Sequence, residues 1–456
     1  MPEATSAVKA APGERSPEGY VPRLGLFSGT MMVVGGIIGS GIFLNPAIVA
    51  QRVGTVGLTL GVWLAGGIIA LIGAMVFAEL GARRPVAGGG YVYLRECFGK
   101  LPAFLYGWTL LLVIATGAIA AVAVTFAGYS AALLGLEPRA AVPIAVGAIL
   151  TLSAINYLGV RPGAITQNVF TLLKLGALAL LIVAGLASTS TPAPYVAPVG
   201  EAGNVPLAVG AALVPVLFAF GGWQQTNFIA EELRDPARNL PRALLAGVAL
   251  VVVVYLLANL AYVKTLGVSG LARSSAPAAD VMGTLMGNTG RTLIAAGIAV
   301  SAFGFLNLVI LVSPRVYRAM ARDGLFFSRL ARLHPRYRTP GAAIVLQGGW
   351  AILLTLTGGY GDLLDYVVFG DWIFFGTTAG TLFLYRSRER RGLETGDLRF
   401  RIPGYPVTPL IFILAALYVV LGSVLSNPAN ALKGTALMAL GVPVFLFWKR
   451  RSITSL

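Results

Sequence analysis

Charged residues, cysteine and histidine are all scarce in this sequence. Of its 456 residues 11% are charged, whereas a soluble globular domain has about 25%. The single cysteine, Cys97, excludes an internal disulfide bond. With one histidine, His334, in a basic loop, the chain also lacks the convergent acid–base groups or metal ligands that a membrane-embedded enzyme would need. We therefore expect no enzymatic activity, no metal ion and no cofactor.

Long apolar runs fill most of the chain. Hydrophobic residues make up 57% of the sequence, and about 20 consecutive apolar residues cross a bilayer as a helix. The pattern predicts an all-α integral membrane protein with twelve transmembrane helices, at approximately 24–50, 54–80, 101–132, 140–158, 167–187, 207–232, 240–263, 290–320, 340–357, 364–386, 407–425 and 430–448.

Lys and Arg are distributed unevenly between alternate loops. If the N-terminus is inside, the predicted inner segments hold 27 of the 34 Lys and Arg residues and the outer loops hold six. Because inner loops carry the excess of positive charge, we expect a multi-pass protein of the cell (inner) membrane with both termini in the cytoplasm. Residues 1–23, which show no secretory signal, and 449–456 would be cytoplasmic tails. The net charge of +16 would face anionic membrane lipids rather than a nucleic acid.

Four glycines interrupt the apolar stretch of residues 33–43 in the first predicted span. Glycine weakens a helix by about 1 kcal/mol relative to alanine. A helix that breaks at membrane depth exposes peptide groups that lipid cannot satisfy. Such a break is tolerated where it lines a cavity, which in a transporter is the substrate site. A close packing surface between helices would also use small residues, so this stretch alone leaves both interpretations open.

A second interruption, at residues 218–223, lies in the sixth predicted span just after Pro215. Corresponding interruptions in two halves indicate an inverted repeat around a central site. The repeat would comprise a first five-helix unit, 24–187, and a second, 207–386, followed by two additional helices in 407–448. It is inferred from position, because the halves share no obvious sequence identity.

Peptide groups at the two breaks are candidates for holding a zwitterion. The free N–H groups around Ser40, Gly41 and Ile42 would begin a half-helix, where a partial positive charge favours a carboxylate. Carbonyl groups that end the opposing half-helices would accept hydrogen bonds from an ammonium, namely those of Ile37, Phe218 and Gly221.

Several motifs together resemble one family of transporters. They are residues 36–43 (Gly-Ile-Ile-Gly-Ser-Gly-Ile-Phe), 218–223 (Phe-Ala-Phe-Gly-Gly-Trp), Asn227, Glu231-Glu232, 235–241 (Asp-Pro-Ala-Arg-Asn-Leu-Pro), Arg315 and 321–324. The chain resembles the amino acid–polyamine–organocation superfamily, and within it the L-amino acid transporter branch, from about residue 24 to 450. The resemblance implies a twelve-helix bundle with discontinuous first and sixth helices, and amino acid transport or exchange. It also implies that the main chain at the breaks, with Ala219 at the second, binds the substrate's α-carboxylate and α-amino groups.

The same resemblance assigns side chains near the second break. Phe218 would be the aromatic gate that covers the bound substrate, although most membrane phenylalanines face lipid or the core. Trp223, Gln224 and Gln225 would contact the substrate's side chain. The branch more often has asparagine where Gln224 stands, which leaves that contact open.

Lys174 is a charged residue inside the fifth predicted span. A charge at the bilayer centre costs about 3 kcal/mol or more unless it is paired or hydrated, and no carboxylate lies near it in the sequence. We therefore expect carbonyl and hydroxyl partners. By resemblance the ammonium takes the place of a sodium ion and bridges the first span, near Gly35 and Gly36, to the eighth span at Ser313. Transport would then be independent of sodium. A snorkelling lysine and proton coupling are the alternatives.

Asp371 lies in the tenth predicted span, where the branch usually has a neutral residue. It would recognise a cationic or hydroxylated side chain, or carry a proton. The alternative is an interfacial residue near the outer surface, and the sequence favours neither interpretation.

Other polar residues are expected to stabilise the bundle or its closed states. Glu79, Glu231 and Glu232 stand at inner span ends and would pair with nearby arginines, such as Arg83, Arg234 and Arg315. Ser301 and Asn307 of the eighth span would line the site or form hydrogen bonds between helices.

Cys97 lies in a predicted inner loop. Animal members of the branch that bind a glycoprotein partner use an outer-loop cysteine, so we expect no disulfide-linked partner of that kind.

The sequence therefore predicts a sodium-independent secondary transporter, an exchanger or facilitator, of neutral L-amino acids that works by alternating access. Apart from Asp371 no charge is predicted at the site, which favours neutral substrates. The alternative is a proton-coupled symporter or an exchanger of cationic amino acids or polyamines, and a channel also remains open at this point.

Overall fold

The computed structural model is built from helices, and it describes residues 19–189, 204–358, 360–393, 398–426 and 428–454. Within these ranges the only strand-like pairing is a single parallel bridge between Leu24 and Leu233. The helices are α1 (Leu26–Ile37), α2 (Gly41–Val53), α3 (Val56–Arg83), α4 (Gly90–Phe98), α5 (Lys100–Thr109), η1 (Leu110–Ile114), α6 (Ala115–Leu133), η2 (Pro138–Ala140), α7 (Ala141–Tyr157), α8 (Val160–Ala187), α9 (Val205–Ala219), η3 (Trp223–Glu232), α10 (Pro236–Arg273), α11 (Pro277–Val312), α12 (Pro314–Arg322), η4 (Ser328–Ala331), α13 (Gly341–Thr357), α14 (Tyr360–Arg390), α15 (Val407–Ser426), α16 (Pro428–Ala439) and α17 (Gly441–Thr454).

The apolar helices are long enough to cross a membrane, as the sequence predicts. In the described part of the chain nine helices pass this test, or ten if the bent pair α1 and α2 forms one span. The two further predicted spans, 340–357 and 364–386, fall on α13 and α14. The eighth span is longer than expected, because the helical segment runs over Pro277–Arg322 with a break at Ser313.

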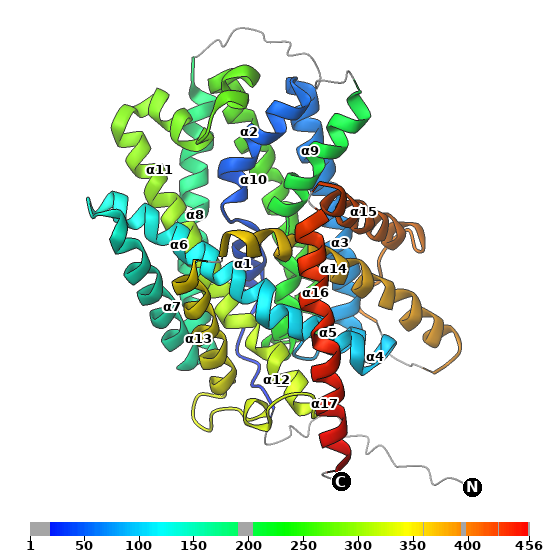
Figure 1. Ribbon diagram of the computed structural model, residues 1–456. Helices are drawn as coiled ribbons and strands as arrows, with labels where there is room; N and C mark the ends of the chain where they lie inside the picture. Colours follow the sequence, from blue (N-terminus) through cyan, green and yellow to red (C-terminus); the bar gives the residue numbers. More distant parts are fainter. Residues whose placement is uncertain (1–18, 190–203, 359, 394–397, 427, 455–456) are drawn as a thin grey trace.

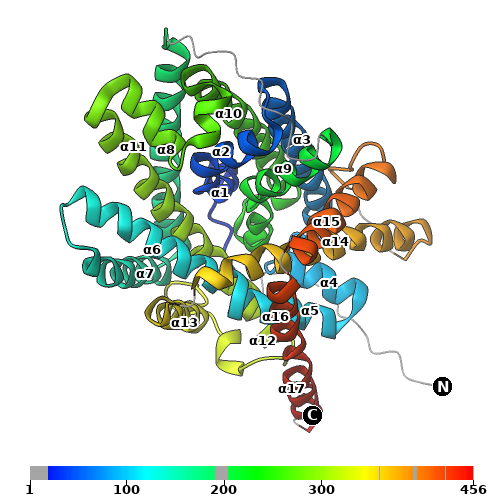
Figure 2. The same cartoon turned by 45° about the horizontal axis from the view of Figure 1, so that its top comes forward.

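The predicted break in the first span is present. α1 ends at Ile37, α2 begins at Gly41, and the two helices are bent by 44° relative to each other. Figures 1 and 2 both place this pair inside the bundle, where α1 packs against α8 and α10, and α2 packs against α9 and α10. The glycine-rich segment is therefore surrounded by protein, which lets it expose peptide groups inside a membrane.

The second predicted break is also present. α9 ends at Ala219, and after Gly222 the chain continues as η3, a 3₁₀ helix that runs to Glu232. Gly222 has a φ of 103°, in the left-handed region that glycine adopts readily. The chain therefore changes direction at Gly222.

A third irregularity interrupts the span made by α5 and α6. Leu110–Ile114 forms a π-helical turn, a local widening that frequently occurs at functional sites. Two side chains satisfy carbonyls there: Trp350 Nε1 donates to Leu112 O at 3.1 Å, and Thr116 Oγ1 donates to Leu111 O at 2.6 Å. No glycine or proline marks this turn within residues 110–114, so the sequence did not reveal it.

Ion pairs gather at one end of the bundle, here called the arginine-rich end and defined by Arg83, Arg95, Arg315 and Arg386. Their carboxylate partners are held at short distances: Glu79 lies 2.7 Å from Arg83 and 2.6 Å from Arg386, Asp323 lies 2.8 Å from Arg95, and Glu232 lies 2.8 Å from Arg315. The expected pairs Glu79–Arg83 and Glu232–Arg315 are confirmed. Glu231 makes no ion pair among the described residues.

The segment before α1 covers the Glu232–Arg315 pair. The amides of Arg23 and Leu24 both donate to Glu232 O at 2.9 Å, and Arg234 N donates to Leu24 O at 2.8 Å. The Tyr20 ring lies 4.7 Å from the Arg318 guanidinium, and burial raises the pKa of its phenol to about 12. The helices of the arginine-rich end are therefore connected by both ion pairs and main-chain hydrogen bonds.

Candidate functional site

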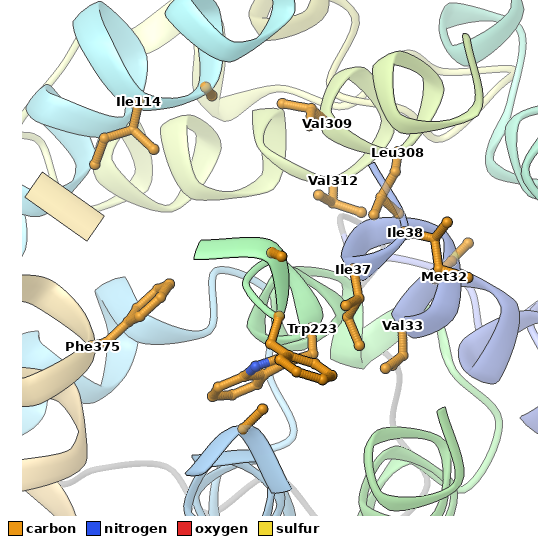
Figure 3. Close-up of a cluster of buried hydrophobic side chains, with 14 of the residues drawn as sticks. Met32, Val33, Ile37, Ile38, Ile114, Trp223, Leu308, Val309, Val312 and Phe375 are labelled. Carbon is orange, nitrogen blue, oxygen red and sulfur yellow. The ribbon is translucent and has the colours of Figure 1, made fainter. Parts of the chain in front are cut away.

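A cavity of about 210 Å³ lies between the two breaks. It is walled by both broken helices and by the π-helical turn, α6, α11 and α14. The lining residues are Gly36, Ile37, Gly39, Ser40, Gly41, Tyr106, Leu110, Ile114, Ala115, Ala118, Ala121, Val122, Thr125, Phe218, Ala219, Gly221, Gly222, Gln224, Gln225, Phe228, Ile298, Ala302, Phe305, Val309, Ser313, Asp371, Trp372 and Phe375. Figure 3 shows Ile114 and Phe375 reaching toward this space from one side, with Ile37 and Val309 on the other.

The two breaks touch each other through their main chains. A Cβ atom on Gly222 would lie 2.2 Å from Gly36 O, and a Cβ atom on Gly36 would lie 2.9 Å from Gly222 O. Further along, a Cβ atom on Gly41 would lie 2.9 Å from the Cβ of Ala219. A Cβ atom would therefore clash at Gly222 and Gly36, and the absence of a side chain lets the two irregular backbones lie against each other beside one cavity.

Free N–H groups begin α2 at the cavity wall. The amides of Ser40, Gly41 and Ile42 have no hydrogen-bond acceptor among the described residues. The side chain of Ser40 is exposed, and Ser40 and Gly41 line the cavity. Such a helix start is suited to an anion.

Carbonyl groups of the opposing half-helices are partly satisfied by the protein. Phe218 O accepts from Gly221 N at 3.0 Å, and Gly221 O has no donor among the described residues. Ile37 O accepts from Gly39 N at 2.9 Å and from the Tyr255 hydroxyl at 3.1 Å.

Two tyrosines of α10 form hydrogen bonds with main-chain carbonyls at the breaks, and no pattern in the sequence indicates this. The buried Tyr255 hydroxyl lies 3.1 Å from Ile37 O and 3.3 Å from Ala219 O, the last residues of α1 and α9. Tyr262 Oη donates to Ile42 O at 3.2 Å. Tyr255 therefore ties together the ends of both half-helices.

Lys174 is fully buried on α8 and reaches the first break. Its Nζ donates to Ile38 O at 2.8 Å and to Gly35 O at 3.1 Å. Ser301 Oγ of α11 donates to the same Ile38 carbonyl at 3.2 Å. The expected carbonyl partners are present, but the α11 hydroxyl at this point is Ser301. Ser313, which was expected here, instead lines the cavity at the start of α12.

The side chains expected near the second break divide into two groups. Phe218 is 42% exposed and lines the cavity. Gln224 also lines it, but its Oε1 accepts from Gly222 N at 3.1 Å and so stabilises the break. Trp223 differs from the expectation: it is buried behind the lining, where its ring packs 5.1 Å from Phe77. The phase of η3 turns Trp223 away from the cavity.

Asp371 lies on α14 in the cavity wall, half-buried, and not at an outer interface. It is the one Asp, Glu, Lys or Arg among the described residues that line the cavity. Its carboxylate has no hydrogen-bond or ion-pair partner in the described part of the chain. Within that same part, no three His, Cys, Asp or Glu side chains gather as metal ligands would.

Two interrupted helices that meet around a cavity in an all-helical membrane bundle define a membrane permease with discontinuous helices.

Comparison with known proteins supports this class. The profile of the family described as amino acid permease matches residues 24–447. The b(0,+)-type amino acid transporter 1 of Mus musculus is 35% identical over 441 residues, covering 93% of this chain and 87% of the relative. The large neutral amino acids transporter small subunit 2 of Mus musculus is 34% identical over 442 residues, covering 94% and 82%.

The chain belongs to the amino acid permease family, within the amino acid–polyamine–organocation superfamily and its L-amino acid transporter branch. It is a multi-pass membrane protein and an amino acid transporter rather than an enzyme.

We expect Tyr255→Phe to raise the KM for the transported amino acid by about 2- to 10-fold, since one hydroxyl hydrogen bond contributes about 0.5–1.5 kcal/mol. The substitution removes the hydroxyl that joins Ile37 O to Ala219 O, so the half-helices lose a mutual restraint. Initial rates of counterflow in proteoliposomes measure the change. Tyr129→Phe is the matched control, because the Tyr129 hydroxyl has no partner among the described residues. An unchanged KM in Tyr255→Phe would show that this bridge does not position the site.

Proposed function

We propose that this protein is a sodium-independent secondary transporter, an exchanger or facilitator, of neutral L-amino acids, and that it works by alternating access. The observation that supports this most is the contact between the two broken helices around one cavity, with Ser40, Gly41 and Gly221 presenting peptide groups to it.

The substrate's head group would be held by main-chain atoms. The α-carboxylate would accept from the free amides of Ser40, Gly41 and Ile42, where the start of α2 carries a partial positive charge. The α-ammonium would donate to the free carbonyl of Gly221 and to the remaining lone pairs on Ile37 O and Phe218 O. Phe218, exposed in the cavity wall, would act as the gate over the bound substrate.

The substrate's side chain would extend toward α6, α11 and α14. This part of the lining is apolar over Ile114, Ala118, Val122 and Val309. Apolar lining accepts neutral side chains through burial of apolar surface, at about 25 cal/mol per Å². Neutral L-amino acids therefore match most of the wall.

Sodium independence would follow from the position of Lys174. The side-chain nitrogen of Lys174 already donates to Gly35 O and Ile38 O beside the first break. A sodium ion at the same carbonyls would have to displace this donor, and it would meet a like charge whenever the amine is protonated, which is unfavourable.

Alternating access would require the arginine-rich end to open and close. In the conformation seen here, that end would be closed by the Arg315–Glu232 pair, whose side chains are 0% and 2% exposed, and by the segment from Tyr20 to Leu24.

We further propose that the bundle has twelve membrane helices. The units 24–187 and 207–386 would be related by an inverted repeat, 407–448 would add two helices, and 1–23 and 449–456 would be tails, of which residues 1–18 and 455–456 lie outside the described residues.

Orientation and partners follow from charge and from Cys97. The arginine-rich end would face the cytoplasm, in contact with anionic lipids of the cell membrane, so that both termini lie in the cytoplasm.

Cys97 is half-buried on α4 beside Glu96 and Arg95 of that end, with its Sγ 3.7 Å from Thr381 O. We propose that it forms no disulfide with an extracellular glycoprotein partner, although one relative's name calls it a small subunit.

A second candidate function is proton-coupled symport or exchange of cationic amino acids or polyamines. Asp371 in the cavity wall is the observation that favours it.

Counterflow of labelled amino acids in proteoliposomes tests the proposal. For an exchanger, we expect labelled leucine to enter vesicles only when they contain unlabelled amino acid. For a facilitator, we expect it to enter empty vesicles down its own gradient. In both cases the rates should be equal in sodium and choline buffers. Uptake that requires a sodium or pH gradient would contradict exchange or facilitation. Flux that does not saturate would indicate a channel.

A further inference from the structure

The π-helical turn η1 changes which side chains of the span made by α5 and α6 face the cavity. Five lining residues of this span follow one another at intervals of four, namely Tyr106, Leu110, Ile114, Ala118 and Val122. In a regular α-helix, with about 3.6 residues per turn, each interval of four adds about 40°, so Tyr106 and Val122 would face directions about 160° apart. A π-helical turn closes its hydrogen bonds over five residues, and the one extra residue reduces this angle to about 60°. The wide turn therefore lets both parts of the span line one cavity.

A wide turn leaves main-chain carbonyls that need other donors. Ala115 N donates to the carbonyl five residues earlier, so Leu111 O loses the donor that it would have in an α-helix. Thr116 Oγ1 donates to Leu111 O at 2.6 Å in its place. Leu112 O accepts from Trp350 Nε1 of α13 at 3.1 Å. The turn is therefore stabilised by one side chain of its own span and by one side chain of another helix.

Trp350 reaches the cavity only through η1. Its side chain is half-buried and does not line the cavity in the described part of the chain. Ile114 of the same turn points toward the cavity (Figure 3). α14 also packs against this residue, because a Cβ atom on Gly370 would lie 3.4 Å from Ile114 Cδ1. The position of the turn in the wall therefore depends on α13 and α14, and the Trp350 hydrogen bond is the directional contact.

We propose that Trp350 is a positioning residue for substrate selection, and that the turn it stabilises forms a wall of the compartment for the substrate's side chain. The inference rests on the proposed function, because it takes the head group to be held at the two breaks. A long apolar side chain would extend from the breaks to Leu110 and Ile114 and bury apolar surface against them. The side chain of alanine ends at its β-carbon, next to the head group. Trp350 would therefore affect the affinity for long side chains and leave the binding of the head group unchanged.

Norleucine and alanine test this role, because they share the head group and differ in side-chain length. Trp350→Phe retains an aromatic ring and removes the N–H that donates to Leu112 O. Counterflow of labelled leucine is measured well below its KM, so that the half-inhibitory concentration of each competitor reports its own binding. We expect this concentration to rise about three- to tenfold for norleucine, as for the loss of one hydrogen bond, and to stay within about twofold for alanine.

Trp108→Phe is the matched control. Trp108 lies on α5 of the same span, and its Nε1 donates to Leu437 O of α16 at 3.1 Å. Among the described residues it is not part of the cavity lining. This variant loses an equivalent hydrogen bond, so it should show a similar loss of thermal stability with an unchanged ratio between the two competitors.

The outcomes separate this inference from the proposed function. An unchanged norleucine value in folded Trp350→Phe, an equal rise for norleucine and alanine, or the same change in Trp108→Phe would refute the role of Trp350, and amino acid exchange would stand. If Trp350→Phe does not fold, Thr116→Val removes the other donor to the turn, and the same results are expected of it. If the wild-type protein exchanges no amino acid, the proposed function itself fails.

Discussion

Gly222→Ala is expected to reduce amino acid counterflow about a hundredfold or more, because a misplacement of about 1 Å at a site can cost that much. The new Cβ would lie 2.2 Å from Gly36 O and 2.7 Å from the Gly36 carbonyl carbon. Both atoms belong to main chain, so neither moves away by a change of rotamer. The two breaks must separate, and the peptide groups at the cavity lose their relative positions.

The control for Gly222→Ala must share its backbone strain without its clash. Gly287 also has a positive φ, of 61°, but a Cβ there meets nothing within 4 Å. Gly287→Ala should therefore lower thermal stability slightly, by the strain of a left-handed alanine alone, and leave counterflow close to the wild-type rate. Normal transport by Gly222→Ala would show that the contact between the breaks is not required.

The second large effect is expected for Lys174→Met, with counterflow about tenfold slower or worse. Methionine keeps an unbranched side chain of similar length but removes the ammonium that donates to Gly35 O and Ile38 O. Each buried carbonyl left without a donor costs about 1–3 kcal/mol, although Ser301 still donates to Ile38 O. The end of α1 would then lose its connection to α8.

Lys264→Met serves as the control, because Lys264 is exposed and donates to Leu186 O away from the cavity. The wild-type protein and the Lys264 variant should give equal rates in sodium and choline buffers. Full activity of Lys174→Met in choline would contradict a role for the ammonium at the break. A sodium requirement in the wild-type protein would contradict the proposed substitution of Lys174 for the ion.

The two breaks could be predicted from the sequence because their signal is local. Glycine within an apolar run is visible in the chain itself, and the structure has one break at residues 38–40 and the other at 220–222. The kind of partner that Lys174 has, a carbonyl group, could be predicted because a buried ammonium without a carboxylate nearby needs such acceptors, whereas its position at the first span was implied by the family resemblance.

The errors concern the rotational phase and register of helices. Trp223 lies directly after a break, and the direction of its ring depends on the geometry of η3, which no pattern in the sequence specifies. The hydroxyl that shares the Ile38 carbonyl with Lys174 is Ser301, more than three helical turns from the predicted Ser313. Local sequence does not determine which turn of α11 lies beside α1.

The contact of Tyr255 with both breaks could not be predicted. Tyr255 is separated by 218 residues from Ile37, whose carbonyl it reaches. A tyrosine in an apolar span is equally consistent with a membrane interface. For Asp371 the sequence left two interpretations, and the cavity lining resolves its position in favour of the site.

The central claim is that main-chain groups of two facing breaks bind the zwitterionic head of the substrate. An experimental structure of the protein with bound leucine tests it most directly. The account predicts carboxylate oxygens about 2.9 Å from the amides of Ser40, Gly41 and Ile42, and the ammonium at similar distances from carbonyls of Ile37, Phe218 or Gly221. A head group bound by side chains elsewhere, with those amides facing only water, would contradict it.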